Sequence, residues 1–344
     1  MLMFDSDYLE GCLPEILVAL QKTNLEQSSG YGRDKYCEEA KKTMNELCGR
    51  EDIDVHFLVG GTQTNQTVIA SILRPHQGVI CADTGHINVH ETGAVELTGH
   101  KVLALPSREG KITAAQIKRT IESHYEEDGP EHMVQPAMTY ISFPTEKGTL
   151  YSIDELEAIS TVCKKCDIPL FIDGARLGYG LASPKSDVTL KDIARLCDVF
   201  YLGGTKQGAI FGEAVVFCNK KLAKDFRYYI KQHGAMLAKG RLLGIQFQTL
   251  LRNGTYFKVA EQADIFALEI RKAFEQKGYR MFTDSYTNQQ FPILPNEAIN
   301  KLREKFSFEN WAKVDTKHTA VRFCTSWATT QEQVQILLRE IKNL

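Results

Sequence analysis

A regular alternation of short apolar runs and amphipathic stretches between residues 55 and 218 is the feature that most constrains the fold of this chain. The apolar runs have the length and composition of buried strands, and helical periodicity marks the stretches between them. Strands that are apolar on both faces and separated by helices indicate a mostly parallel sheet covered by helices on both sides. Seven strands are predicted, at 55–59, 78–82, 101–105, 138–143, 169–173, 199–203 and 213–217. Helices are predicted between them at 64–73, 113–124 and 153–166, the last with a capping box of Ser152 and Glu155.

The pattern changes after residue 219, where strands give way to longer helical stretches. Helices are predicted at about 219–233, 241–252, 257–277, 295–303 and 330–342, the last two within a mixed tail that also holds strand-like runs. Together the two patterns predict an α/β protein. A large domain is expected over residues 16–250 and a small C-terminal α+β domain over residues 251–344.

The bulk composition excludes several classes of function. The formal net charge of −2 argues against a nucleic-acid surface, and no apolar run approaches the ~20 residues of a membrane span. Neither nucleic acid nor membrane is therefore expected as a partner. The first residues lack the basic and apolar regions of a signal peptide, and nine scattered cysteines suit a reducing cytoplasm. Their spacing predicts no metal site, and Cys163 and Cys166 are expected to be core or surface thiols.

Three polar features follow the predicted strands, at the edge where ligands bind in α/β sheets. The first is the turn Gly60-Gly61-Thr62, which opens a helix. Glycines let a ligand approach the backbone, the hydroxyl adds a donor, and the N-terminus of a helix favours an anion. A phosphate would suit this turn, although it lacks the lysine of a P-loop and such turns also occur without an anion.

The second feature is Asp173, at the end of an apolar strand, and the third is Lys206, bracketed by glycines after the next strand. A buried acid can keep the pyridine nitrogen of pyridoxal 5′-phosphate (PLP) protonated, or it can pair locally with Arg176 or cap a helix. Desolvation would lower the pKa of the lysine and make its amine nucleophilic, as Schiff-base chemistry requires; a solvated loop lysine is the alternative. Phosphate turn, acid and lysine in this order indicate a PLP enzyme.

The order and spacing of these features resemble fold-type I PLP enzymes, and the motifs resemble the threonine aldolase (β-eliminating lyase) family. The resemblance runs from residue 5 to about 245 and resumes near Arg322. The matching segments are Asp5-Ser6-Asp7, Tyr31-Gly32 with Glu38 and Glu39, Gly61-Thr62-Gln63-x-Asn65, Gly85-His86-Ile87 with Glu91 and Gly93, Asp173-Gly174-Ala175-Arg176, and Lys206.

The resemblance implies a role for each matching residue toward the cofactor. Lys206 would form the Schiff base, and Asp173 would bond the pyridinium nitrogen. His86 would stack on the ring, where an unrelated histidine would more often be a core or capping residue. The phosphate and its surroundings would be held by Gly61, Thr62, Gln63 and Thr205.

The resemblance also implies substrate and subunit contacts. Arg176 would lie near the cofactor's phenolate oxygen or the substrate carboxylate. Arg322, followed by Thr325, would bind the substrate carboxylate together with Ser6, because a planar guanidinium suits bidentate recognition; a structural ion pair is the alternative for Arg322. The N-terminal segment 1–15 would thus contribute to the active site.

A basic pair of the family reaches the phosphate of a neighbouring subunit. Lys231 and Arg241 resemble this pair, with a three-residue difference in spacing, and exposed helix charges are the alternative reading. The resemblance implies a homodimer or homotetramer with active sites at the subunit interface.

One segment departs from the family. Threonine aldolases have a segment like E-N-T-H-N before the D-G-A-R strand, whereas residues 142–149 here contain no histidine. The lysine segment, Gly-Gly-Thr-Lys-Gln-Gly, also differs from the commoner Ser-Leu-Ser-Lys. Because a β-hydroxyl proton must leave during aldol cleavage, some base or ordered water must accept it, and His86, Glu146 acting through water or His90 could substitute for the missing histidine. A neutral imidazole suits this role best near neutral pH.

We therefore expect PLP-dependent aldol cleavage of an L-β-hydroxy-α-amino acid to glycine and an aldehyde. A PLP-dependent β-eliminating lyase or aminotransferase is the alternative within the same chemistry. A cofactor-free binding protein that keeps the fold is an alternative of another class. The complete set of Lys206, Asp173, His86 and Arg176 argues against the last.

Overall fold

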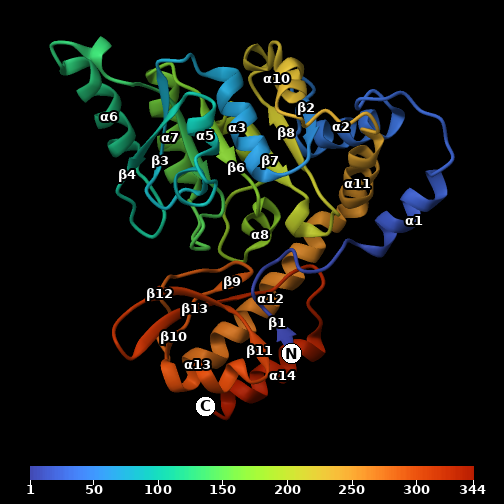
Figure 1. Cartoon of the computed structure of the whole chain (residues 1–344), viewed down its shortest axis with the longest axis vertical. Helices are drawn as coiled ribbons and strands as arrows, with labels where there is room; N and C mark the ends of the chain where they lie inside the picture. Colours follow the sequence, from blue (N-terminus) through green and yellow to red (C-terminus); the bar gives the residue numbers. More distant parts are fainter.

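The computed structural model describes all 344 residues and shows a large sheet domain joined to a smaller domain by a long helix (Figure 1). The seven strands of the large sheet lie within three residues of the predicted bounds. They are β2 (Asp54–Leu58), β3 (Gln77–Ala82), β4 (Lys101–Leu105), β5 (Gln135–Ser142), β6 (Leu170–Asp173), β7 (Val199–Gly203) and β8 (Glu213–Phe217). Their order is β2-β8-β7-β6-β5-β3-β4, and every pair is parallel except the two that involve β8. The predicted fold class is confirmed.

The reversed direction of β8 matters for the site. In the antiparallel pairs, the first residue of β8, Glu213, lies opposite Leu58 at the end of β2 and Gly203 at the end of β7. The edge of the sheet that carries the carboxyl ends of the other strands therefore also carries the amino end of β8.

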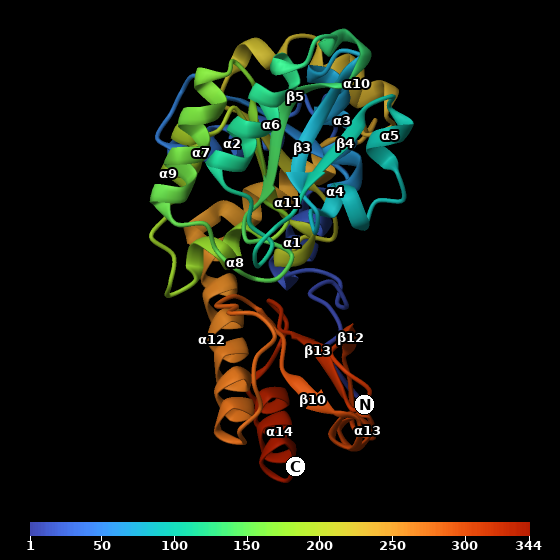
Figure 2. The same ribbon diagram turned by 90° about the vertical axis from the view of Figure 1, so that its left-hand side faces the viewer.

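Helices cover both faces of the sheet. Figure 2 shows α6, α7 and α9 on one side and α3, α4 and α5 on the other. Alternate residues of β6 face the two layers, since Leu170 and Ile172 pack in one core cluster and Phe171 in the other. The helices of this domain are α1 (Pro14–Thr23), α2 (Lys35–Cys48), α3 (Gly61–Ile72), α4 (His86–Val89), α5 (Ala94–Leu97), α6 (Ala114–Glu126), α7 (Ile153–Lys165), α8 (Leu177–Ala182), α9 (Leu190–Leu196), α10 (Phe226–Gln232) and α11 (Arg241–Leu251), with 3-10 turns η1 (Pro130–His132), η2 (Thr205–Gln207), η3 (Lys220–Ala223) and η4 (Arg252–Gly254).

Two local predictions have different outcomes. The capping box is confirmed, because the Ser152 hydroxyl accepts from the Glu155 N–H at 3.2 Å and the Glu155 carboxylate accepts from the Ser152 N–H at 2.8 Å. The single helix predicted at 219–233 is wrong, because the chain forms η3 and α10 instead. Asp225 lies between them with a φ of 62°, a left-handed conformation that interrupts a helix.

The small domain combines an antiparallel sheet with three helices. Its elements are α12 (Thr255–Gln276), β9 (Gln289–Gln290), β10 (Ile293–Pro295), α13 (Asn296–Arg303), β11 (Phe306–Ser307), β12 (Glu309–Lys313), β13 (His318–Cys324) and α14 (Gln331–Lys342). The helix α12 runs from the large domain into the small one (Figures 1 and 2). The N-terminal strand β1 (Leu2–Met3) pairs in parallel with β11, so the first residues of the chain belong to this domain. No helix is both long and apolar enough to cross a membrane.

Phe4 anchors the N-terminal strand in the small-domain core. Its ring is 2% exposed, and its centroid lies 6.2 Å from those of Phe306 and Phe323. Truncation to alanine leaves a cavity, so we expect Phe4→Ala to lower the free energy of unfolding by about 3–5 kcal/mol, measured by urea denaturation. Leu25→Ala, at a side chain that is 93% exposed, should change it by no more than about 0.5 kcal/mol. Equal effects of the two substitutions would contradict this assignment of the core.

Candidate active site

A cavity of about 600 Å³ lies at the carboxyl edge of the large sheet, between that edge and residues of the small domain. The large domain contributes the turn Gly60–Thr62 and residues from the ends of β5, β6 and β7. The small domain contributes three side chains from β12 and β13. Of the residues predicted from the sequence, the cavity brings together Gly61, Thr62, His86, Asp173, Arg176, Thr205, Lys206 and Arg322.

Asp173 is a buried carboxylate surrounded by hydrogen-bond donors. Its Oδ1 accepts from the Tyr201 hydroxyl at 2.5 Å and from the Ala175 N–H at 3.0 Å. Its Oδ2 accepts from the Asn65 amide at 3.0 Å and from the Tyr140 hydroxyl. Burial raises the pKa of Asp173, but the nearby His86 imidazole and these donors outweigh burial and hold the pKa below its usual value. The carboxylate therefore stays ionised, and it does not pair with Arg176.

A chain of hydrogen bonds connects Asp173 to His86. The Asn65 amide donates to Oε1 of the buried Glu91 at 2.7 Å as well as to Asp173. The same Glu91 oxygen lies 2.8 Å from Nδ1 of His86, the first residue of α4. Because a carboxylate can only accept, Nδ1 carries a proton and Nε2 is left free in the cavity. The Glu91 carboxylate thus sets the tautomer of the histidine.

Lys206 lies in η2, directly after β7, and is half-buried on the cavity wall. Burial and the nearby Arg176 guanidinium lower its pKa. The carboxylates of Asp7 and Asp173, and that of Glu213 once it is ionised, act in the opposite direction without cancelling that shift. The lysine is therefore not a solvated loop residue, and its amine loses a proton more easily than an exposed one.

Arg176 is held by a carboxylate of the N-terminal segment. Its Nε and Nη2 donate to the two oxygens of Asp7 at 2.7 and 3.0 Å, and Asn288 also donates to Asp7 at 2.9 Å. Burial raises the pKa of Asp7, but the charges of Arg176 and Lys206 outweigh it and hold the pKa below its usual value. This bidentate pair fixes the guanidinium at the cavity wall.

Arg322 reaches the cavity from β13 in the small domain. Its Nη2 forms an ion pair with Glu309 at 2.6 Å and donates to the Asp5 carbonyl at 2.8 Å, and its Nη1 donates to Gln289 at 3.1 Å. Its Nε is buried without a partner. The ion pair proposed as the alternative to substrate binding therefore exists, but Glu309 is about half exposed and itself lines the cavity.

The helix α3 presents its N-terminus to the cavity, and no side chain caps it. The first N–H groups of a helix lack intrahelical partners, so those of Gly61 and Thr62 are free for an anion. Gln63 is used differently from its predicted role. Its side chain accepts from the Val59 N–H at 3.2 Å and donates to the His233 carbonyl at 3.0 Å, outside the cavity lining.

Glu146 occupies the segment that lacks the family histidine. Its Oε1 accepts from the His86 N–H at 2.9 Å and from the Ser142 hydroxyl at 2.6 Å. Burial raises the pKa of Glu146, although the Ser142 hydrogen bond opposes that shift. His90, another candidate base, lines the cavity with its ring centroid 5.5 Å from that of His86.

The other predicted residues lie outside the cavity lining. Ser6 is buried nearby, and Thr325 donates to the Ala263 carbonyl at 2.7 Å. Lys231 lies over the Tyr31 ring with Nζ 5.1 Å from the centroid. Arg241 donates to the carbonyls of Thr23 and Glu26.

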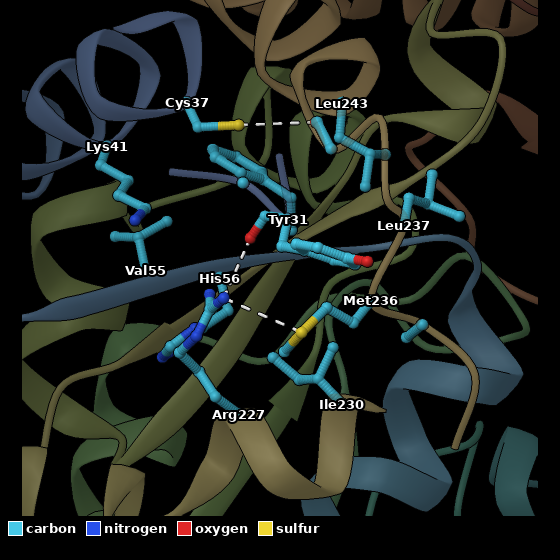
Figure 3. Close-up of a pocket in the computed structure, with 14 residues that line it drawn as sticks. Tyr31, Cys37, Lys41, Val55, His56, Arg227, Ile230, Met236, Leu237 and Leu243 are labelled. Carbon is cyan, nitrogen blue, oxygen red and sulfur yellow. Dashed lines mark hydrogen bonds between the residues drawn. The ribbon is translucent and has the colours of Figure 1, made fainter. Parts of the chain in front are cut away.

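Tyr31 also lines a separate small pocket of about 30 Å³, which has room only for water (Figure 3). There Arg227 donates to the Tyr31 carbonyl at 3.0 Å and contacts Sδ of Met236. These contacts hold the Tyr31 segment against the segment that follows α10.

Six residues of the site were not predicted as site residues: Asp7, Asn65, Glu91, Tyr140, Tyr201 and Glu213. Asp7, Asn65 and Glu91 stand within the matching motifs, so the motifs contained a signal for them. Tyr140 and Tyr201 lie inside apolar strands, where a tyrosine is usually read as core. Glu213 begins a strand instead of following one.

Comparison with known proteins gives a consistent result along the whole chain. The beta-eliminating lyase family matches residues 4–296. A low specificity L-threonine aldolase of Pseudomonas sp. (strain NCIMB 10558) is 31% identical over 98% of this chain and 96% of its own length, and the enzyme of that name from Pseudomonas aeruginosa shows the same identity. A solved structure of Leishmania major threonine aldolase superposes with a TM-score of 0.97 at 42% identity, covering 100% of this chain and 99% of the other. Thermus thermophilus aspartate aminotransferase, at 13–14% identity and a TM-score of 0.72, shares the fold.

The Tyr140 hydroxyl should contribute measurably to stability because it donates to a charged, buried acceptor. We expect Tyr140→Phe to lower the free energy of unfolding by about 1.5–3 kcal/mol at neutral pH. This loss of unfolding free energy should become smaller as the pH falls below ~4. The pKa of Asp173 is lowered in the folded protein, so the hydrogen-bonded carboxylate stabilises the fold only while it is ionised.

Tyr151→Phe is the matched control, since its buried hydroxyl accepts from the neutral Ile112 N–H. Tyr151→Phe should lower the free energy of unfolding by about 0.5–1.5 kcal/mol, and this loss should not change as the pH is lowered into the acid range. Urea denaturation at several pH values measures both variants. A pH-independent loss for Tyr140→Phe would contradict the ionised Asp173.

Proposed function

The chain belongs to the β-eliminating lyase family, and from that premise we propose that it is a PLP-dependent threonine aldolase. It would cleave a threonine-like L-β-hydroxy-α-amino acid into glycine and an aldehyde. The observation that carries the proposal is that Lys206, Asp173 and the uncapped N-terminus of α3 line one cavity. The threonine aldolases similar to this chain over nearly its whole length support the substrate class.

The residues of the cavity fit PLP. Lys206 provides an amine of lowered pKa, and Asp173 provides a carboxylate that stays ionised against a pyridinium nitrogen. The free N–H groups at Gly61 and Thr62 suit a phosphate. When bound, PLP supplies an electron sink for the negative charge left at the substrate Cα after the Cα–Cβ bond breaks.

Lys206 would hold the cofactor and afterwards carry a proton at the substrate Cα. Its lowered pKa suits both tasks, because the amine must lose and regain a proton near neutral pH. Arg176, fixed by Asp7, would present a rigid cationic donor to the cofactor's phenolate oxygen or the substrate carboxylate.

Arg322 would bind the substrate carboxylate. Its present anionic partner, Glu309, is about half exposed, so a substrate carboxylate can replace that side chain while the bonds to Asp5 and Gln289 stay in place. A guanidinium that is already oriented loses less freedom when it binds. Ser6, buried near the same segment, would assist.

His86 is our choice for the group that accepts the β-hydroxyl proton. Its Nδ1–H is held by Glu91, which leaves Nε2 as a base and lets the carboxylate stabilise the imidazolium that forms. Glu146 acting through water is the second candidate, because one of its oxygens is already occupied by two donors. His90 is the third.

The active protein would be a cytoplasmic homodimer or homotetramer. Both Lys231, over the Tyr31 ring, and Arg241, bonded to the carbonyls of Thr23 and Glu26, lie outside the lining of their own cavity, as expected if they serve the phosphate of another subunit.

The proposed reaction is tested by incubating the purified protein and PLP with L-threonine, L-allo-threonine and phenylserine. We expect glycine and aldehyde in equal amounts. Lys206→Ala should abolish both the activity and the visible absorption band, and borohydride should fix the cofactor on Lys206 in the wild type. A 2-oxo acid without glycine would instead indicate the alternative, a β-eliminating lyase or an aminotransferase.

The choice of base is tested with two isosteric or nearly isosteric variants. His86→Asn should lower kcat for L-threonine by about 10²–10⁴-fold, the usual contribution of a general base. Glu146→Gln keeps an acceptor for the His86 N–H and should lower kcat much less. If Glu146→Gln has the larger effect, Glu146 is the base and His86 serves only in packing on the cofactor.

A further inference from the structure

Glu213 is a buried carboxyl group between two segments of the cavity wall, the Gly60–Thr62 turn and the segment that holds Thr205. It begins β8, opposite Leu58 and Gly203, so it lies between the strand that leads to the Gly60–Thr62 turn and the strand that leads to Thr205. Its side chain lines the same cavity as both segments. The residue is only 3% exposed.

The two oxygens of this carboxyl group differ. Oε1 lies 3.0 Å from the Thr205 hydroxyl, which also accepts from the Gly212 N–H at 3.0 Å. Oε2 is buried and has no hydrogen-bond partner. No ion pair joins either oxygen to Lys206 within 4 Å. A buried polar atom without a partner is costly, so Oε2 calls for a ligand atom.

The protonation state follows from these surroundings. Burial, with a smaller contribution from the Asp173 charge, raises the pKa of Glu213 to about 8 against the opposing effects of Thr205 and Lys206. At neutral pH the side chain is therefore mostly a neutral carboxylic acid with one O–H to donate.

The groups on this part of the wall that lack a partner within the protein are then donors. The α3 N-terminus offers the N–H groups of Gly61 and Thr62, and Glu213 offers an O–H. The carboxylate-binding guanidinium of Arg322 lies in the other domain. A ligand group with several acceptor oxygens and negative charge satisfies such a wall, and a phosphate monoester has both.

We propose that Glu213 binds the phosphate group of the cofactor by donating a hydrogen bond from its protonated carboxyl group through Oε2. This inference rests on the proposed function, since it requires PLP. Ionisation of Glu213 would place a carboxylate against the phosphate, so PLP affinity should fall as the pH rises through the pKa of Glu213.

The other titratable groups facing Glu213 are Lys206, Asp173, Tyr201 and Tyr256. Pyridoxal, which lacks the phosphate, uses the same lysine and aspartate as PLP. The ratio of the dissociation constants for pyridoxal and PLP therefore isolates the phosphate contribution from the titration of the other groups.

The experiment measures this ratio for the apoprotein by fluorescence titration between about pH 7 and about pH 9.5. We expect the wild-type preference for PLP to fall by about tenfold across that range. Glu213→Gln, which donates an N–H at every pH, should keep the preference nearly constant. Glu213→Ala should show a preference about tenfold lower than wild type at pH 7 and no pH dependence.

Asp264→Asn is the matched control, a buried carboxyl group of α12 outside the cavity lining, and its ratio should follow the wild type. Circular dichroism and urea midpoints check that each variant folds, and the near-isosteric glutamine variant provides the test if the alanine variant does not. Binding of inorganic phosphate is measured as the rise in melting temperature that it gives the apoprotein. This rise should depend on pH in the same way as the ratio of dissociation constants.

Three results would overturn the inference. The ratio and its pH dependence could be unchanged in Glu213→Gln and Glu213→Ala. The Glu213 variants could lose affinity for PLP and for pyridoxal by the same factor, which would mean that Glu213 acts through Lys206. If wild type bound neither PLP nor pyridoxal, the proposed function itself would fail, which is distinguishable from the first two results.

Discussion

The site depends on keeping one carboxylate, that of Asp173, ionised inside the protein. Burial alone would favour its neutral form, and the opposing donors come from four different places: α3, β5, β7 and the turn after β6. Tyr140 and Tyr201 can reach Asp173 only because β5, β6 and β7 are neighbours in the sheet. Strand order and the charge state of the site are therefore linked, and Asn65 extends the same network to Glu91 and His86.

Most of the fold could be predicted from the sequence because its signals are local. Each strand of the large sheet is a separate apolar run, and long helices such as α12 carry a clear period. Four-residue helices such as α4 and α5 are too short to show one. The break at Asp225 depends on a backbone conformation that periodicity does not report. The direction of β8 depends on how a short connection returns the chain to the sheet.

The candidate site was predictable where a residue follows a strand or stands in a motif, as Lys206, Asp173 and His86 do. Side-chain direction was not predictable. Alternate residues of a strand face opposite layers, and the sequence does not say which of them reaches the acid, so Tyr140 and Tyr201 resembled core residues. Gln63 stands in the phosphate motif, yet its amide holds the turn together instead of facing the cavity.

The N-terminal strand has a consequence for how the protein is made. Asp7 bonds Asn288 across 281 positions of sequence, and the Asp5 carbonyl accepts from Arg322. Ribosomes add ~5–20 residues per second, so the first residues emerge roughly 15 to 60 seconds before these partners exist. A chain released before β11 and β13 would hold Lys206 and Asp173 but leave β1 an unpaired edge. Completion of the active site therefore requires that synthesis has passed Arg322.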